Sequence, residues 1–165
     1  MSGIKFDLTT ESLNQLQKLI DVFDDVQPAL HVIGRTMLTR INLGFKTATD
    51  PWGVAWKPLA IRQGQPLRDT GKYQRSHTYN VVGDGVEIGT NATQARLQHF
   101  GGWVTPRTAK ALRFYASNGA PIFSKAVYIP ARPAMPILPN GQAVLPTAWE
   151  QATLKALQKH FESKI

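Results

Sequence analysis

The sequence predicts one α+β domain over residues 1–165, with helices at both ends and a small antiparallel sheet between them. Apolar residues recur at steps of three and four in the first third of the chain and again at its end, as on one face of a helix. Between residues 77 and 129 they instead alternate with polar residues around glycine-containing turns, which is typical of β-hairpins. The chain therefore divides into a helical front half (1–48), an aromatic and basic loop (49–76), hairpins (77–129), a proline-rich arm (130–146) and a C-terminal helix (147–165).

The front half predicts a short strand followed by two helices. Residues 4–8 alternate between apolar and polar, and residues 13–23 carry apolar side chains at helical spacing. Pro28 suits the first turn of a second helix, where its missing N–H has no partner to lose. The buried face of that helix is predicted to consist of Leu30, Ile33, Met37, Ile41 and Phe45. The two helices form either a helical hairpin or one long bent helix, packed on the sheet.

The stretch DPWGVAWKPLA, residues 50–60, cannot form one uninterrupted helix because it contains two prolines and a glycine. It also contains Trp52 and Trp56, two of the four tryptophans of the chain. Because two indoles bury much apolar area, we predict that both turn inward and act as staples between the helices and the sheet. The second interpretation is that they are anchors at an interface with another protein.

Three further residues, Asp69, Gly71 and Gly101, are predicted to act as structural staples by holding turns. Asp69 and Gly71 belong to LRDTGK, where Asp-Thr-Gly is a natural turn, so Asp69 is expected to cap that turn rather than to orient a catalytic base. Asn91 with Gln94 forms a capping box that opens a short helix, and Gly101 is expected to end it.

Two hairpins are predicted in the central region. The first lies within residues 79–88 and turns at the GDG sequence. The second joins a strand at 112–115 to a strand at 122–129 through Asn118 and Gly119.

Residues 130–146 contain five prolines and are predicted to form an extended, semi-rigid arm. Arg132 stands between Pro130 and Pro133, so its backbone has little freedom. Its guanidinium either holds a carboxylate or backbone carbonyls, or is solvated.

The last helix is predicted to begin with a second capping box, formed by Thr147 and Glu150. Its apolar side is predicted to carry Leu154, Leu157, Phe161 and Ile165.

The formal net charge of +8 is unevenly distributed along the chain. No Asp or Glu occurs from residue 89 to residue 148, a stretch that contains Arg96, Arg107, Lys110, Arg113, Lys125 and Arg132. Such a field attracts a polyanion or an acidic protein surface. These cations are therefore our candidates for an interface with a polyanion or with an acidic protein surface. The alternative is that they serve solubility and local structure.

The sequence offers few residues for chemistry. It has no cysteine, which excludes a disulfide scaffold and a cysteine-ligated zinc site. Its histidines lack metal-ligand spacing, its acids do not pair, and GDGVEIG lacks the Lys-Ser/Thr of a phosphate-binding loop. We therefore expect no catalytic residue, metal or cofactor, and not an enzyme. We also expect neither a secretory signal nor a membrane span, and so a cytosolic product.

Four stretches resemble one known family in their order and spacing: FKTATDPWGVAWKPLA (45–60), LRDTGKYQRS (67–76), VEIGTNATQARLQHFGG (86–102) and VYIPARPAM (127–135). Through them the chain is similar to the phage virion morphogenesis family, the tail-completion proteins of Mu-like and P2-like phages. The chain departs from the family pattern at Gln94-Ala95, where an aromatic-alanine pair is usual, and at Ala134-Met135, where Phe-Leu is usual.

This resemblance implies a structural virion protein, present in the host cytoplasm during assembly, at the head-proximal end of a phage tail. There it would act as a tail-completion, terminator or neck component that joins tail to head. It implies a homo-oligomeric ring, expected to be a hexamer, next to tail-tube and neck or connector proteins, with no cofactor and no membrane partner.

Two hypotheses follow about contacts within such a ring. Subunits would associate through sheet edges or through the hairpin between 103 and 126, as in strand addition. The cations would face DNA in the lumen, without sequence preference, or an acidic neighbouring ring. The alternative function is a basic, sequence-independent nucleic-acid-binding protein that acts alone.

Overall fold

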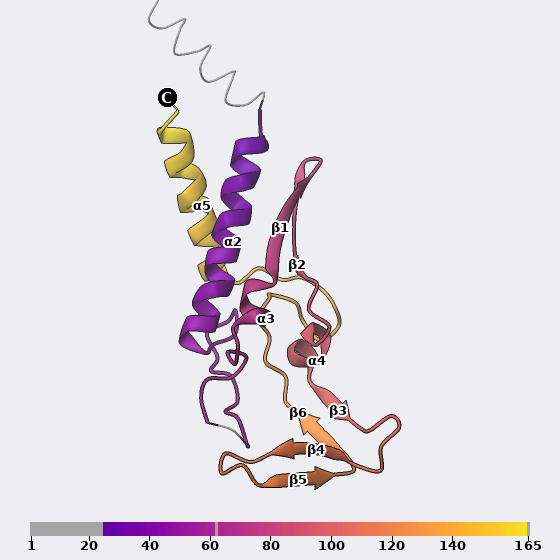
Figure 1. The fold of residues 1–165 in the computed structure, drawn as a ribbon. Coiled ribbons are helices and arrows are strands. Elements are labelled where there is room, and N and C mark those ends of the chain that lie inside the picture. Colours follow the sequence, from indigo (N-terminus) through magenta and orange to yellow (C-terminus); the bar gives the residue numbers. More distant parts are fainter. Residues whose placement is uncertain (1–24, 62, 165) are drawn as a thin grey trace, which may run out of the picture.

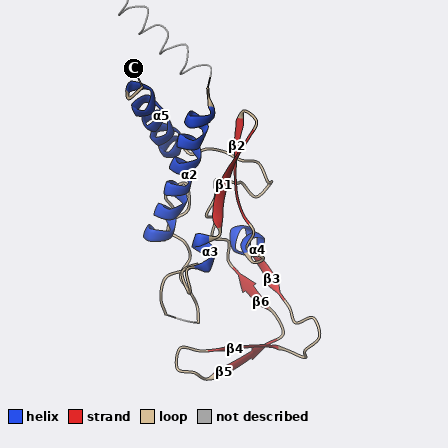
Figure 2. Ribbon diagram, turned by 45° about the horizontal axis from the view of Figure 1, so that its top comes forward, coloured by secondary structure: helices blue, strands red, loops and turns tan. Residues whose placement is uncertain are grey.

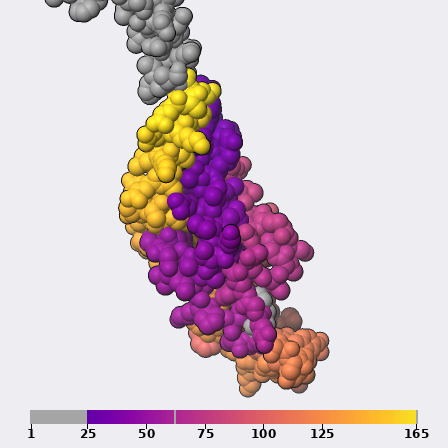
Figure 3. Space-filling model, turned by 90° about the vertical axis from the view of Figure 1, so that its left-hand side faces the viewer, coloured from indigo at the N-terminus to yellow at the C-terminus, as the bar shows by residue number. Residues whose placement is uncertain are grey.

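Helix α2 (Gln27–Thr47) is the element around which the others are arranged in the computed structural model, which describes residues 25–61 and 63–164 (Figure 1). Helix α5 (Thr147–Glu162) packs along one side of α2, and Figure 3 shows the two helices side by side. The hairpin of β1 (His77–Val82) and β2 (Gly85–Thr90) packs on another side of α2 (Figure 1). The predicted α+β class is confirmed.

Helix α2 agrees with its sequence pattern. Pro28 lies in its first turn, and Met37, Ile41 and Phe45 are buried on its inner face. The strand predicted at 4–8 and the helix predicted at 13–23 lie outside the described residues. The choice between a helical hairpin and one long bent helix depends on these residues, so the described part of the chain does not test it.

The first hairpin is confirmed, and it approaches α2 closely because of a glycine. Strands β1 and β2 are antiparallel, with Tyr79 opposite Ile88, and the turn contains Gly83 at a φ of 56°. A Cβ atom placed on Gly34 of α2 would lie 2.2 Å from Cδ2 of Tyr79. The ring of Tyr79 thus occupies the space that any side chain at position 34 would need.

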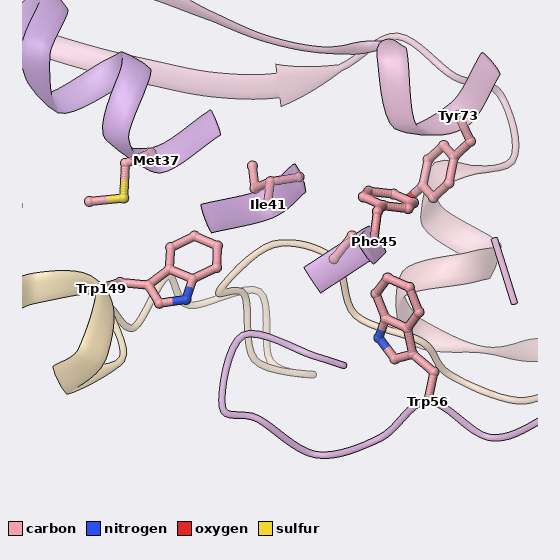
Figure 4. Close-up of a cluster of buried hydrophobic side chains, with 7 residues drawn as sticks. Met37, Ile41, Phe45, Trp56, Tyr73 and Trp149 are labelled. Carbon is pink, nitrogen blue, oxygen red and sulfur yellow. The ribbon is translucent and has the colours of Figure 1, made fainter. Parts of the chain in front are cut away.

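The core lies where α2 meets the tryptophan loop, α3 (Lys72–Arg75), the arm and α5 (Figure 4). Its buried hydrophobic members are Met37, Ile41, Phe45, Trp56, Tyr73, Ala134 and Trp149. Segments far apart in the sequence are therefore held to a single face of α2.

Residues 102–129, which we call the projection, form two small sheets away from this core (Figures 1 and 2). Helix α4 (Ala95–Phe100) leads into β3 (Gly102–Val104), which pairs with β6 (Val127–Ile129). Strands β4 (Leu112–Tyr115) and β5 (Pro121–Ser124) form a separate hairpin. Each sheet has two strands and thus two open edges.

The second predicted hairpin is confirmed in its turn but not in its second strand. Its turn contains Gly119 at a φ of 80°, as the sequence predicts. The strand predicted at 122–129 breaks into β5 and β6, because the chain turns where the Ser124 hydroxyl donates to the Ala126 carbonyl at 2.6 Å. Strand β6 then pairs with β3, which we did not predict.

Both predicted capping boxes are wrong. Helix α4 begins only at Ala95, without a side-chain cap, so Asn91 lies too early to cap it. At α5, Pro146 occupies the cap position in an extended conformation, and its carbonyl accepts the N–H groups of Trp149 and Glu150. Thr147 is already helical and therefore cannot cap.

Two features near the C-terminus also differ from prediction. The arm is not extended throughout, because the Val144 N–H donates to the Pro136 carbonyl at 2.9 Å and closes a loop. In α5 the buried residues are Trp149 and Thr153, whereas Leu154 points to solvent. The face of α5 that packs on α2 is thus set by Trp149, while Ile165 lies outside the described residues. None of the described helices combines the length and the apolar content of a membrane-crossing segment.

Candidate interaction surface

Trp56 is buried, with 6 % of its surface exposed. Its ring packs edge-to-face on Phe45 at 5.4 Å between centroids, and its indole N–H donates to the Pro133 carbonyl at 2.9 Å. The inward orientation that we predicted is therefore confirmed for Trp56, and it connects the end of α2 to the arm.

The same prediction is wrong for Trp52, which is 40 % exposed. The carboxylate of Asp50 accepts the backbone N–H groups of Trp52 and Val54, and the Trp56 N–H donates to the Ala48 carbonyl at 2.8 Å. The loop therefore turns at residues 50–54 and returns to the helix end. Trp52 lies at the tip of this turn, where it cannot reach the core.

Arg132 is a buried structural residue rather than a surface cation, so its inclusion among the interface and lumen candidates is wrong. It is 5 % exposed, and its guanidinium donates to the carbonyls of Lys57 at 2.7 Å and Pro58 at 3.0 Å. Its backbone N–H donates to the Gln98 carbonyl at 2.7 Å. Of the roles that the sequence left open, holding backbone carbonyls is the one observed.

The two glycines predicted as staples both have positive φ angles, 72° at Gly101 and 73° at Gly71. At Gly101 an added Cβ would also lie 2.7 Å from the backbone nitrogen of Ala131, so only glycine fits without movement. Asp69 is exposed in the turn before α3, and its role as the cap of that turn stays a prediction.

Polar rings are buried beside Phe45. Tyr73 and His77 lie edge-to-face at 5.0 Å, and the Tyr73 hydroxyl, His77 Nε2 and His99 Nδ1 have no hydrogen-bond partner among the described residues. Burial lowers the pKa of His77 from its ordinary value of 6.5 and raises the pKa of Tyr73 to about 12. The described residues contain no group of three or more His, Cys, Asp or Glu side chains that could hold a metal ion.

The projection instead presents exposed aromatic side chains. Trp103 is 70 % exposed and Phe123 is 64 % exposed, and more than half of each of Tyr115 and Tyr128 is exposed. Trp103 and Tyr128 are cross-strand partners whose rings lie 5.4 Å apart. The guanidinium of Arg113 lies over the Tyr115 ring at 5.5 Å. Tryptophan, tyrosine and arginine are the residue types that dominate protein interfaces.

The other predicted cations are exposed, and most of them lie on the projection. Arg107, Lys110, Arg113 and Lys125 belong to it, and Arg96 lies on the adjacent helix α4. Every acidic residue that the structure describes lies outside this region, at positions 25, 50, 69, 84, 87, 150 and 162. The projection is thus an aromatic surface with positive charge only.

Sequence reasoning missed the exposed aromatic residues of the projection, although a signal was present. In LRFY (112–115) and in IFS (122–124), apolar or aromatic residues occupy both alternating faces of the strand. A sheet with only two strands and no covering layer cannot bury both faces. Such a pattern therefore indicates a face that another molecule covers.

Comparison with known proteins agrees with these features. The family model described as "Phage virion morphogenesis family" matches residues 8–154. The chain is 30 % identical over 165 residues to "Mu-like prophage FluMu G protein 2" of Haemophilus influenzae, covering 100 % of this chain and 99 % of that protein. No solved structure matches the chain. The chain therefore belongs to the phage virion morphogenesis family, and its role lies in the structure and morphogenesis of a phage virion.

Proposed function

We propose that the protein forms a ring at the head-proximal end of a phage tail and joins the tail to the head. The observation that carries this proposal is the projection, where aromatic and cationic side chains are exposed together on sheets that nothing in the described chain covers. Membership of the virion morphogenesis family supports a role in assembly. The position of the protein in the particle is our proposal.

The sheets of the projection give a physical reason for assembly. A two-stranded hairpin is marginally stable unless a third strand or a packed layer supports it. Strands β4 and β5 have open edges, and Phe123 and Tyr115 are exposed. Contact with another molecule would bury these rings and add a strand or a layer to the sheet. Association would therefore stabilise the projection.

The charge of the projection restricts its neighbours. Cations without nearby acids favour a surface rich in carboxylates or the phosphates of DNA that passes through the ring. Phosphate contacts of this kind are independent of sequence and weaken steeply with salt. Arg96, Arg107, Lys110, Arg113 and Lys125 remain our candidates for this role.

The decisive experiment is electron microscopy of particles assembled without this protein. We expect filled heads and tails that fail to join, or tails of abnormal length, and expect both defects to be corrected when the protein is supplied again. Normally joined, infectious particles would contradict the proposal.

The second candidate function is nucleic-acid binding by the isolated protein, which the exposed aromatic rings beside cations favour. Fluorescence anisotropy with single-stranded and double-stranded DNA at low salt tests it. Tight binding by the monomer, lost in an Arg113→Ala variant, would favour this function. Absence of binding would favour the assembly role.

A further inference from the structure

Ten of the exposed large hydrophobic side chains among the described residues fall into two separate groups. Of the thirteen large hydrophobic residues that are exposed among the described residues, five lie on or beside the projection: Phe100, Trp103, Tyr115, Phe123 and Tyr128. Five others lie near the end of α2, the tryptophan loop and the start of α5: Leu43, Trp52, Val54, Val144 and Leu145. Contiguous exposed apolar surface of this kind marks interaction sites.

Four of the five residues of the second group line a hollow, and Val54 adjoins Gly53, which also lines it. A recess of about 730 Å³ is lined by residues of the C-terminal half of α2, the tryptophan loop, the end of the arm and the first turn of α5. Leu43, Trp52, Leu145 and Trp149 are among them. We call this recess the hollow. Asp50 and Arg40 also line it, and Glu150 follows Trp149 on α5. The hollow is therefore mainly apolar, with one carboxylate and one guanidinium in its wall and the Glu150 carboxylate next to it.

From these two surfaces we infer that the projection of one copy docks into the hollow of a neighbouring copy. This inference rests on the proposed ring and names the surfaces that build it. One surface protrudes and the other is recessed, so the complementary contact joins the projection of one copy to the hollow of another. A reciprocal exchange would close a dimer, whereas a one-way contact leaves a free projection and a free hollow for further copies. A contact between two different patches is heterologous, and it repeats around a ring when its rotation closes.

The charges also fit a second copy. The projection has cations only, and all described carboxylates lie elsewhere in the chain. Figure 1 shows the β4–β5 hairpin at the far end of the molecule from α5, so it cannot fill the hollow of its own chain. In a neighbouring copy, the two cations Arg113 and Lys125 would meet a side of the molecule where two carboxylates, Asp50 and Glu150, outnumber the one cation of the wall, Arg40.

Cysteine cross-linking tests the contact directly, because the chain has no cysteine of its own. Phe123→Cys places a thiol on the projection, and Val54→Cys places one beside the hollow, both at exposed positions. The full-length variants are mixed, at high concentration and in assembled particles, and then oxidised. We expect a disulfide-linked dimer in the mixture and a ladder of oligomers from the double variant.

A matched control uses Leu154→Cys, which is about as exposed as Val54 but lies further along α5 than the residues that line the hollow, whereas Val54 adjoins the lining residue Gly53. We expect at least a tenfold lower yield of dimer when it replaces Val54→Cys. Equal yields, or a preference of Phe123→Cys for itself, would overturn the inference.

A third outcome separates this inference from the proposed function. If Phe123→Cys in particles becomes linked to a different virion protein, and particles without the protein still show unjoined heads and tails, the docking inference is wrong. The proposed role in joining would then stand. If particles without the protein are normal, the proposed function fails whatever the cross-linking shows.

Discussion

At the scale of single residues, the two tryptophans of one loop have different environments. Trp56 packs on Phe45 and donates to the arm, whereas Trp52 is at the exposed tip of the turn. The sequence predicts a buried indole in this loop but does not distinguish the two positions. The distinction depends on the Asp50 turn, whose hydrogen bonds determine which tryptophan returns to the helix.

Trp56→Ala should lower the free energy of unfolding by about 3–5 kcal/mol, because a large buried ring is lost and a cavity remains. Trp52→Ala is the matched control and should change it by less than about 1 kcal/mol. Urea denaturation followed by circular dichroism measures both. Equal effects of the two substitutions would contradict the assignment of Trp56 as the staple.

Arg132→Ala should lower the free energy of unfolding by about 2–3 kcal/mol, because two backbone carbonyls lose the charged donor that a buried guanidinium supplies. Arg132→Lys should recover only part of this, since an ammonium lacks the planar fork that reaches both carbonyls. Thermal melts of the three proteins make the comparison. A stable Arg132→Ala protein that fails only in particle assembly would place Arg132 at an interface instead.

His77 should make stability depend on pH. Burial lowers its pKa below 6.5 in the folded state, so the unfolded chain binds a proton that the folded chain does not. Its contribution is fully present above about pH 6.5 and is lost as the pH falls through the folded pKa. In urea titrations, His77→Gln should flatten the pH dependence between pH 7 and 5, and an unchanged slope would contradict this.

At the scale of elements, hairpins were better predicted than helix ends. Gly83 and Gly119 adopt the positive φ angles that their turns require, and only glycine does so at little cost. The capping boxes failed because their motifs resemble ordinary turns. At α5 the position before the helix was taken by Pro146, and at α4 the helix started later than Asn91 allows.

The pairing of β3 with β6 could not be predicted from the sequence. Strand β3 has three residues and β6 has three, which is too short for a clear alternation pattern. Their partnership depends on where the chain turns at Ser124 and Ala126 and on the close approach of Gly101 to Ala131. Both are tertiary features.

Gly34→Ala tests the packing of α2 on β1. The added methyl group would collide with the Tyr79 ring and should cost about 1–3 kcal/mol, even though alanine favours helices. In the background of Tyr79→Ala the same change should be neutral or stabilising, because the obstructing ring is gone. Chemical denaturation of the four proteins gives the coupling free energy, and strict additivity would contradict the contact.

At the scale of the whole molecule, the sequence predicted that charge is unevenly distributed along the chain, but not where the charged residues lie in the fold. The acid-free stretch is visible in the sequence, and the structure places most of its exposed cations on one projecting module. Arg132 is the exception, since its environment is set by the loop that folds over it. Charge counts alone cannot separate a buried arginine from a solvated one.

Hydrogen exchange should distinguish the projection from the core. Amides of residues 112–124 should exchange at least tenfold faster than those of β1 and α2 in the isolated protein, because only two strands protect them. In assembled particles their exchange should slow strongly, while the core changes little. Mass spectrometry of both samples measures this, and slow exchange in the isolated protein would contradict a need for neighbours.

The junction at Gly101 and Arg132 has a mechanical consequence. The chain enters and leaves the projection at adjacent points, where Gly101 touches Ala131 and Arg132 holds Lys57, Pro58 and Gln98. This makes the base of the projection a stiff pivot, and the projection a lever. A force on its tip would pass to helix α4 through Gly101 and Gln98, and through the Arg132 guanidinium to the loop that contains Trp56.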